Sequence, residues 1–205
     1  EYDDGANHYL LVASYDGVWR STNNGPFDAA PRFLNNNRIT SIVTDPNNLG
    51  TECFVTTDDT GDYSPGVYRI SNPFTGTIGG PYRIGGTSIT NLRYGMELCA
   101  VNNNGTTELL YAGQPRTTDT HGWIYWGTSN PSTATSEGDV TWTSKTPVQK
   151  TGDPDYWSVM LWNTIAGRCS GGNLEVVIGA LKEGSNSNTW MATMAMTEDL
   201  ANCNT

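Results

Sequence analysis

Three aspartates in one short segment have a spacing that suits a cation site. Asp58, Asp59 and Asp62 lie in a glycine-containing stretch between two strand-like runs. Carboxylate oxygens are the hard ligands that calcium prefers, although the spacing and the missing terminal glutamate differ from an EF-hand loop. The segment therefore predicts a bound calcium ion or, as the plainer alternative, a solvated acidic hairpin tip.

Carboxylates at strand ends also raise the question of glycoside hydrolysis, which needs one carboxyl as acid and another as base or nucleophile. The aspartates expected at strand ends are Asp16, Asp45, Asp58 and Asp119. Asp16 and Asp45 each stand in a turn that favours aspartate for its conformation alone. Neither His8 nor His121 has the context of a catalytic triad. The sequence therefore favours a non-catalytic protein and assigns no catalytic residue.

Aromatic residues are the predicted ligand contacts. The chain has seven Trp and ten Tyr, and the densest group is Trp123, Tyr125 and Trp126. Exposed aromatic rings stack on sugar rings, while neighbouring polar side chains fix the orientation of the ligand. Alternation along a strand places Trp123 and Tyr125 on one face and Trp126 on the other, so at least one set is expected in the core.

The cysteines point to disulfides rather than to a metal. Cys53, Cys99, Cys169 and Cys203 form no CxxC pair, and only two histidines accompany them, so a zinc site of ordinary spacing is not expected. An even number of cysteines in a composition typical of extracellular proteins predicts two disulfides, and four cysteines allow three connectivities. We favour Cys169–Cys203 and Cys53–Cys99, with four buried free thiols as the alternative.

Composition and charge limit the classes of binding partner that are expected. The net charge is -10, and the 11 Lys and Arg residues are scattered, so nucleic acid and anionic membrane surfaces are not expected partners. No apolar run approaches the roughly 20 residues that span a bilayer. A sparsely charged acidic surface is typical of a secreted or cell-surface protein. Asn104-Gly105-Thr106 matches the N-glycosylation pattern.

One strand–turn–strand unit recurs along the chain. Its first copy is the segment 9–25, and its second strand, Gly17 to Ser21, returns as Gly66 to Ser71 and as Gly122 to Trp126. The units cover residues 8–38, 39–88, 89–147 and 156–205. Repeats of 40–50 residues with four strands each are the signature of propeller blades. The sequence therefore predicts a single all-β domain over residues 1–205, a β-propeller-like array of about four antiparallel four-stranded blades.

The segments VASYDGVWRSTNNG, RITSIVTDPNN and GVYRIS resemble the Asp-box (BNR-like) β-propeller families, which include sialidases, xyloglucan-cleaving hydrolases and sortilin-type propellers. Their hallmark is Ser-x-Asp-x-Gly-x-Thr-Trp. Ser21 to Gly25 matches its first half with Asn for Asp, and Thr135 to Trp142 matches its second half with Glu for Asp and Asp for Gly. The resemblance implies that the box is structural: a polar side chain caps the turn and the aromatic residue packs between sheets.

These observations favour a secreted or cell-surface, non-catalytic module that binds glycans or proteins. Part of a xyloglucanase-type glycoside hydrolase and a self-assembling subunit that pairs through blade edges are the alternatives. The expected strands number three, four, four and three, so the chain is a piece of a larger propeller, an unusually small ring, or a unit completed by another copy. The inner strand of the first blade must come from residues 1–8, from the C-terminus or from another chain.

Overall fold

The computed structural model describes residues 1–86, 89, 92–115, 123–145, 160–170, 173–183 and 190–197. Its regular structure is β, apart from two short 3-10 helices, η1 (Pro131–Thr133) and η2 (Glu137–Asp139). The all-β prediction is therefore confirmed. In the part of the chain that is described, no helix has the length and apolar character to cross a membrane.

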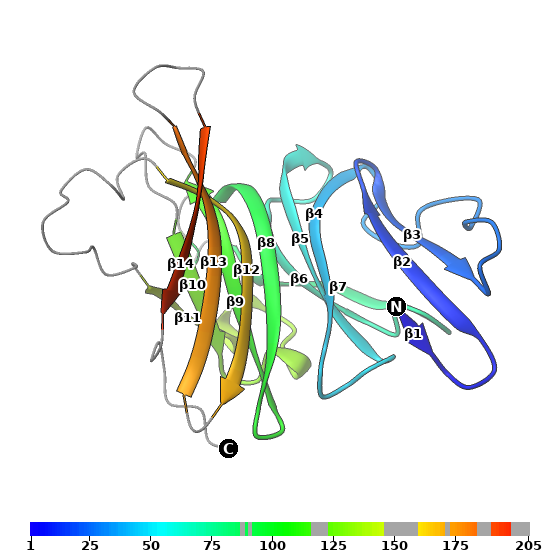
Figure 1. Cartoon of the computed structure of the whole chain (residues 1–205). Coiled ribbons are helices and arrows are strands. Elements are labelled where there is room, and N and C mark those ends of the chain that lie inside the picture. The colour runs from blue at the N-terminus through cyan, green and yellow to red at the C-terminus, as the bar shows by residue number, and fades with distance from the viewer. Residues whose placement is uncertain are drawn as a thin grey trace, which may run out of the picture.

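The strands form four antiparallel sheets in chain order (Figure 1). The first sheet contains β1 (Tyr2–Asp3), β2 (His8–Ser14) and β3 (Gly17–Thr22). The second contains β4 (Asn37–Thr44), β5 (Glu52–Gly61), β6 (Gly66–Ser71) and β7 (Gly79–Gly85). The third contains β8 (Leu92–Asn103), β9 (Thr106–Pro115), β10 (Trp123–Thr128) and β11 (Thr141–Lys145). The fourth contains β12 (Met160–Ser170), β13 (Asn173–Glu183) and β14 (Trp190–Thr197).

A short turn with positive backbone angles joins β8 to β9. Between β8 and β9, Asn103 pairs with Thr106, so the loop is only Asn104-Gly105, with φ values of 47° and 82°. A two-residue hairpin of this kind needs positive φ at both positions, which Asn and Gly adopt most easily. The local sequence thus dictates a meander of consecutive antiparallel strands.

The hydrophobic core is divided into three layers, one between each pair of consecutive sheets. Val18, Val55 and Ile70 belong to the layer between the first two sheets, whereas Phe54 and Leu109 belong to the next. The third layer joins the third and fourth sheets. The leading strands of consecutive sheets lie side by side, since β4 contacts β8 and β8 contacts β12. Among the described strands, neither a barrel nor a closed ring is formed.

The first sheet differs from the others at both edges. Residues 1–8 do supply its inner strand, but β1 pairs with β2 only through Tyr2 with Tyr9 and Asp3 with His8. On the opposite edge, the segment 26–34 runs beside β3, where Arg32 N donates to Val18 O at 2.7 Å. An outer strand is thus replaced by a bonded loop, and the described inner strand pairs with β2 through two residue pairs.

The turn before β11 is held by Asp139. Its carboxylate accepts from the backbone N–H groups of Thr135 at 2.8 Å and Ser136 at 2.9 Å. The sequence match placed Glu137 at the capping position of the box, but Glu137 forms an ion pair with Arg83 at 2.8 Å instead. The capping carboxylate therefore lies two residues further along the chain than the match implied.

Candidate functional site

A cavity of about 420 Å³ lies where the first two sheets meet. Its lining includes Phe33 and Leu34, which are buried, and Asn35, Asp62 and Tyr63, which are exposed. An apolar floor with a polar and aromatic rim is the usual make-up of a small-molecule site. We therefore treat this cavity, called the end cavity below, as the candidate functional site.

Buried Asn37 positions the two loops that form the rim. Its Oδ1 accepts from the backbone N–H of Tyr63 at 3.0 Å, and its Nδ2 donates to Asn35 O at 2.9 Å. Next to it, Asn36 Nδ2 donates to Asp62 Oδ2 at 2.9 Å. The linker between β3 and β4 and the turn between β5 and β6 are thus fastened to each other at the cavity.

Tyr63 is the aromatic group at the rim. Its side chain is 37% exposed. Its ring meets Tyr68 edge-on, with centroids 6.0 Å apart and planes at 81°. The Tyr68 hydroxyl in turn donates to Ser64 O. Tyr63 is therefore supported by the protein while keeping accessible surface.

Arg32 gives one wall of the end cavity a positive charge. Its Nε donates to Pro73 O at 2.9 Å and its Nη2 to Gly76 O at 3.1 Å. Burial, and then the neighbouring Arg20 charge, lower the pKa of Arg32. An arginine stays protonated in proteins despite such effects. The wall thus carries a cation whose Nε and Nη2 donate to neutral carbonyl groups.

A second exposed tyrosine lies at the same end of the molecule. Tyr15 is 77% exposed, and the Arg38 guanidinium lies 4.9 Å from the centre of its ring. The turn that carries Tyr15 is joined to the rim because Asn36 N donates to Asp16 O at 3.0 Å. The sequence analysis selected neither tyrosine as a ligand contact. The available signal was that both stand in Asp-containing turns, where a large aromatic side chain does not pack on a sheet.

The predicted calcium ligands are not seen to converge on one point. Asp58 is fully buried and forms an ion pair with Arg38 at 3.2 Å, whereas Asp62 lies at the exposed turn. The side chain of Asp59 lies outside the described residues. Within the described part of the chain, no group of three His, Cys, Asp or Glu side chains could hold a metal ion. The calcium site stays a prediction.

The described members of the predicted aromatic contact are packing residues. Tyr125 is 6% exposed, and its ring centre lies 6.3 Å from that of Tyr111 in the layer between the second and third sheets. Trp126 faces the other layer and donates to Glu108 Oε2 at 2.8 Å. The side chain of Trp123 lies outside the described residues. Glycan binding by this group stays a prediction without support from the two described rings.

The described carboxylates considered for catalysis are engaged in structural contacts. Hydrogen bonds from Ser14 and Trp19 hold the pKa of Asp16 below its usual value. Asp45 is buried and accepts from Thr107 and from the N–H of Asn47. Asp58 is paired with Arg38, as above, and Asp119 lies outside the described residues. A glycosidase acid must hold its proton near neutral pH, which the lowered pKa of Asp16 opposes.

The predicted Cys53–Cys99 disulfide is wrong, because both residues are free thiols. Cys53 is on β5 and points into the layer between the first and second sheets, while Cys99 is on β8 and packs toward the fourth sheet. Burial raises the pKa of both thiols. Cys169 is disulfide-bonded. Its predicted partner, Cys203, lies outside the described residues, so that pairing stays a prediction.

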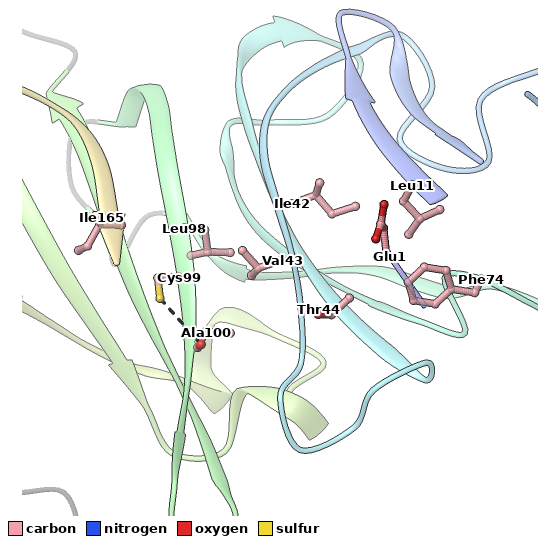
Figure 2. A pocket seen from close by; sticks show the side chains of 10 residues that line it. All are labelled: Glu1, Leu11, Ile42, Val43, Thr44, Phe74, Leu98, Cys99, Ala100 and Ile165. Carbon is pink, nitrogen blue, oxygen red and sulfur yellow. Dashed lines mark hydrogen bonds between the residues drawn. The ribbon is translucent and has the colours of Figure 1, made fainter. Parts of the chain in front are cut away.

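A second cavity, of about 440 Å³, lies along the leading strands (Figure 2). It is lined by Leu11 of β2, Ile42 of β4, Leu98 of β8 and Ile165 of β12, together with Phe74. We call it the inner cavity. Most of its lining side chains are aliphatic, with Glu1 and Thr44 among the polar ones, and it has no exposed aromatic rim like that of the end cavity.

Comparison with known proteins adds no relative: no protein-family model, no curated protein and no solved structure matches this chain.

Proposed function

We propose that this chain is an extracellular, non-catalytic module of β-propeller-like organisation that binds glycans in the end cavity. The observation that carries the proposal is the placement of Tyr63, a supported and partly exposed ring beside Asp62 and Asn35 at the rim of a 420 Å³ cavity. Rings of this kind stack on sugars, and the adjacent polar side chains bond to hydroxyl groups. The contacts of Asp16, Asp45 and Asp58 support binding rather than hydrolysis.

The propeller-like part of the proposal is supported by the order of the sheets. Four antiparallel sheets follow one another along the chain, and each packs its face on the next. Leading strands that lie side by side match the inner strands of propeller blades. The end cavity lies among loops at one end of such an array and opens to solvent there. This position suits recognition of a large glycan.

A glycan array followed by calorimetry tests the proposal. The array carries neutral and uronic-acid-containing oligosaccharides, and the best of them is titrated into wild type, Tyr63→Ala and Leu49→Ala. We expect Tyr63→Ala to weaken binding about tenfold, equivalent to about 1.4 kcal/mol. Leu49 is 61% exposed on the turn at the other end of β5, so Leu49→Ala should bind like wild type.

Two results would contradict the proposal. Binding of no oligosaccharide, or equal binding by wild type and Tyr63→Ala, would remove the end cavity as a glycan site. Release of shorter sugars from the bound oligosaccharide, detected by chromatography, would replace the non-catalytic module with the glycoside hydrolase alternative.

A further inference from the structure

Tyr15 is an exposed ring that is nevertheless held in place. Its side chain is 77% exposed, the highest value among the large apolar side chains of the described residues. The Arg38 guanidinium lies over one face of the ring, 4.9 Å from its centre, in a favourable cation–π contact. Arg38 is anchored in turn by its ion pair with Asp58, whose carboxylate is fully buried. A buried charge therefore positions Tyr15 while the other face of the ring stays accessible.

The turn between β2 and β3, which carries this ring, is fixed by its own hydrogen bonds and by packing. Asp16 Oδ1 accepts from Ser14 Oγ and, at 2.9 Å, from Trp19 Nε1. At Gly17, an added Cβ would come within 2.8 Å of Pro31 Cβ, so the turn lies directly against the linker between β3 and β4. A turn that is ordered in advance loses little conformational freedom when a ligand binds.

Asn36 joins this turn to the turn that carries Tyr63. Its backbone N–H donates to Asp16 O at 3.0 Å, and its Nδ2 donates to Asp62 Oδ2 at 2.9 Å. Each of these acceptors is the chain neighbour of a tyrosine, Tyr15 in one turn and Tyr63 in the other. Figure 1 shows both turns, the one after β2 and the one after β5, at the same end of the molecule. A single residue therefore holds the two tyrosine-bearing turns together.

The backbone of the linker between β3 and β4 is held in an unfavourable conformation at this place. Leu34, which lines the end cavity, has a φ of 54°, in the left-handed region that a leucine seldom adopts. Asn36 lies in the same region, with a φ of 59°. Strained backbone persists only where its surroundings fix it, and it concentrates at ligand sites. The strain therefore supports a role for this linker in presenting the two turns to a ligand.

Two rings on neighbouring turns, each beside an exposed carboxylate, have the chemistry that a sugar chain needs. The apolar face of a sugar ring stacks on an aromatic side chain. Asp16 and Asp62 are exposed next to the two tyrosines, and a carboxylate can accept hydrogen bonds from sugar hydroxyl groups. When a chain has occupied one ring, its contact with the second becomes intramolecular, so affinity increases with chain length. A single sugar can occupy only one of the two rings.

We propose that Tyr15 is a second sugar-stacking subsite outside the end cavity, so that the ligand is a linear oligosaccharide with one sugar on Tyr63 and a later sugar on Tyr15. Tyr15 does not line the end cavity, so this later sugar lies on the surface beside it. The inference rests on the glycan-binding function proposed above. It adds that the ligand contains at least two linked sugars and that affinity depends on chain length.

Affinity measured against chain length tests the second subsite. The probes are the oligosaccharide selected on the glycan array and its fragments down to the monosaccharide, each titrated by calorimetry into wild type, Tyr15→Ala and Tyr63→Ala. Wild type should gain about five- to tenfold in affinity once the chain is long enough to reach Tyr15. Tyr15→Ala should lose this gain but bind the shorter fragments like wild type. Tyr63→Ala should bind more weakly at every length.

Two control variants separate stacking from other effects of a substitution. Tyr15→Phe keeps the ring and should bind every fragment like wild type. Phe27→Ala removes a ring that is 48% exposed beside Ser21, near the opposite end of β3, and should also bind like wild type. Thermal unfolding of Tyr15→Ala should match that of wild type, because the Tyr15 side chain lies mostly outside the core.

The second subsite and the glycan-binding function can fail separately. If Tyr15→Ala bound every fragment like wild type while Tyr63→Ala bound more weakly, the second subsite would be refuted and the end cavity would remain a glycan site. Weaker binding of the monosaccharide by Tyr15→Ala, or equal affinity of wild type for the monosaccharide and the full chain, would refute it in the same way. If no sugar bound, or if Tyr63→Ala had no effect, the glycan-binding function would be refuted together with the second subsite.

Discussion

Trp142 fixes the distance between the second and third sheets. Its indole Nε1 donates to Ile84 O of β7 at 2.8 Å. The ring lies so close to Gly85 and Gly127 that a Cβ atom at either position would come within 2.9 Å or 2.8 Å of it. One aromatic side chain therefore needs a hydrogen-bond acceptor and two glycines, contributed by two different strands, β7 and β10.

Replacing Trp142 by alanine should lower the free energy of unfolding by roughly 3 kcal/mol, the lower end of the range for buried aromatic residues, because Trp142 is partly exposed. Trp142→Phe should lower the free energy of unfolding by less, because an aromatic ring is kept. The remaining loss reflects Ile84 O, which no longer has its donor. Urea denaturation followed by circular dichroism measures both. A loss below about 0.5 kcal/mol, as for an ordinary surface residue, would show that the indole does not hold the sheets together.

At the scale of elements, turns determine where strands begin, and some of these turns are stabilised by carboxylates. Ser136 caps the start of η2 in a capping box in which Asp139 accepts from the Ser136 N–H. Three donors converge on this carboxylate from Thr135 and Ser136. The turn therefore relies on a negative charge at Asp139, which links its stability to pH.

The stabilising effect of Asp139 should depend on pH. The hydrogen bond from the backbone N–H of Thr135 is the largest of the effects that hold the pKa of Asp139 below its ordinary value of 3.8. Because the folded state favours the charged form, the contribution is present above pH 3.8 and is lost as the pH falls through the lower folded pKa. Asp139→Asn should therefore melt below wild type at pH 7, and the gap should narrow at acid pH. A gap independent of pH would contradict this prediction.

The sequence predicted the strands better than the site. Alternation and Asp-Gly or Asn-Gly turns indicated β2, β3 and β6 because those signals are local. The capping carboxylate was misplaced because spacing does not show which of Glu137 and Asp139 faces the turn. The Cys53–Cys99 pairing failed because the layer that a residue faces depends on how sheets stack. Tyr63 was missed because composition does not reveal which rings stay exposed.

At the scale of the whole molecule, polar ties join neighbouring sheets. Arg69 on β6 reaches the third unit by donating to Ala134 O at 2.9 Å. Its Nε also pairs with Glu52 Oε2 at 2.9 Å, and both side chains are largely buried. A further tie runs from buried Asp45 to Thr107 of β9. Such ties fix how one sheet is set against the next.

Arg69→Met should destabilise the protein by roughly 3–5 kcal/mol, because it leaves the Glu52 carboxylate buried without its cation. The double variant Arg69→Met/Glu52→Met should be more stable than the single one, since no charge is then left uncompensated. Both values come from urea denaturation at neutral pH. If the double variant were the less stable of the two, the desolvation argument would be refuted.

The meander order has a consequence for synthesis. Each sheet uses consecutive strands, so it can form as soon as its own residues have left the ribosome. The apolar side chains of β2, Leu11 and Ala13 among them, are covered by the second sheet and emerge before it. The nascent first sheet thus spends the interval until the second sheet forms with its apolar face uncovered, which is when non-native apolar contacts would be most damaging.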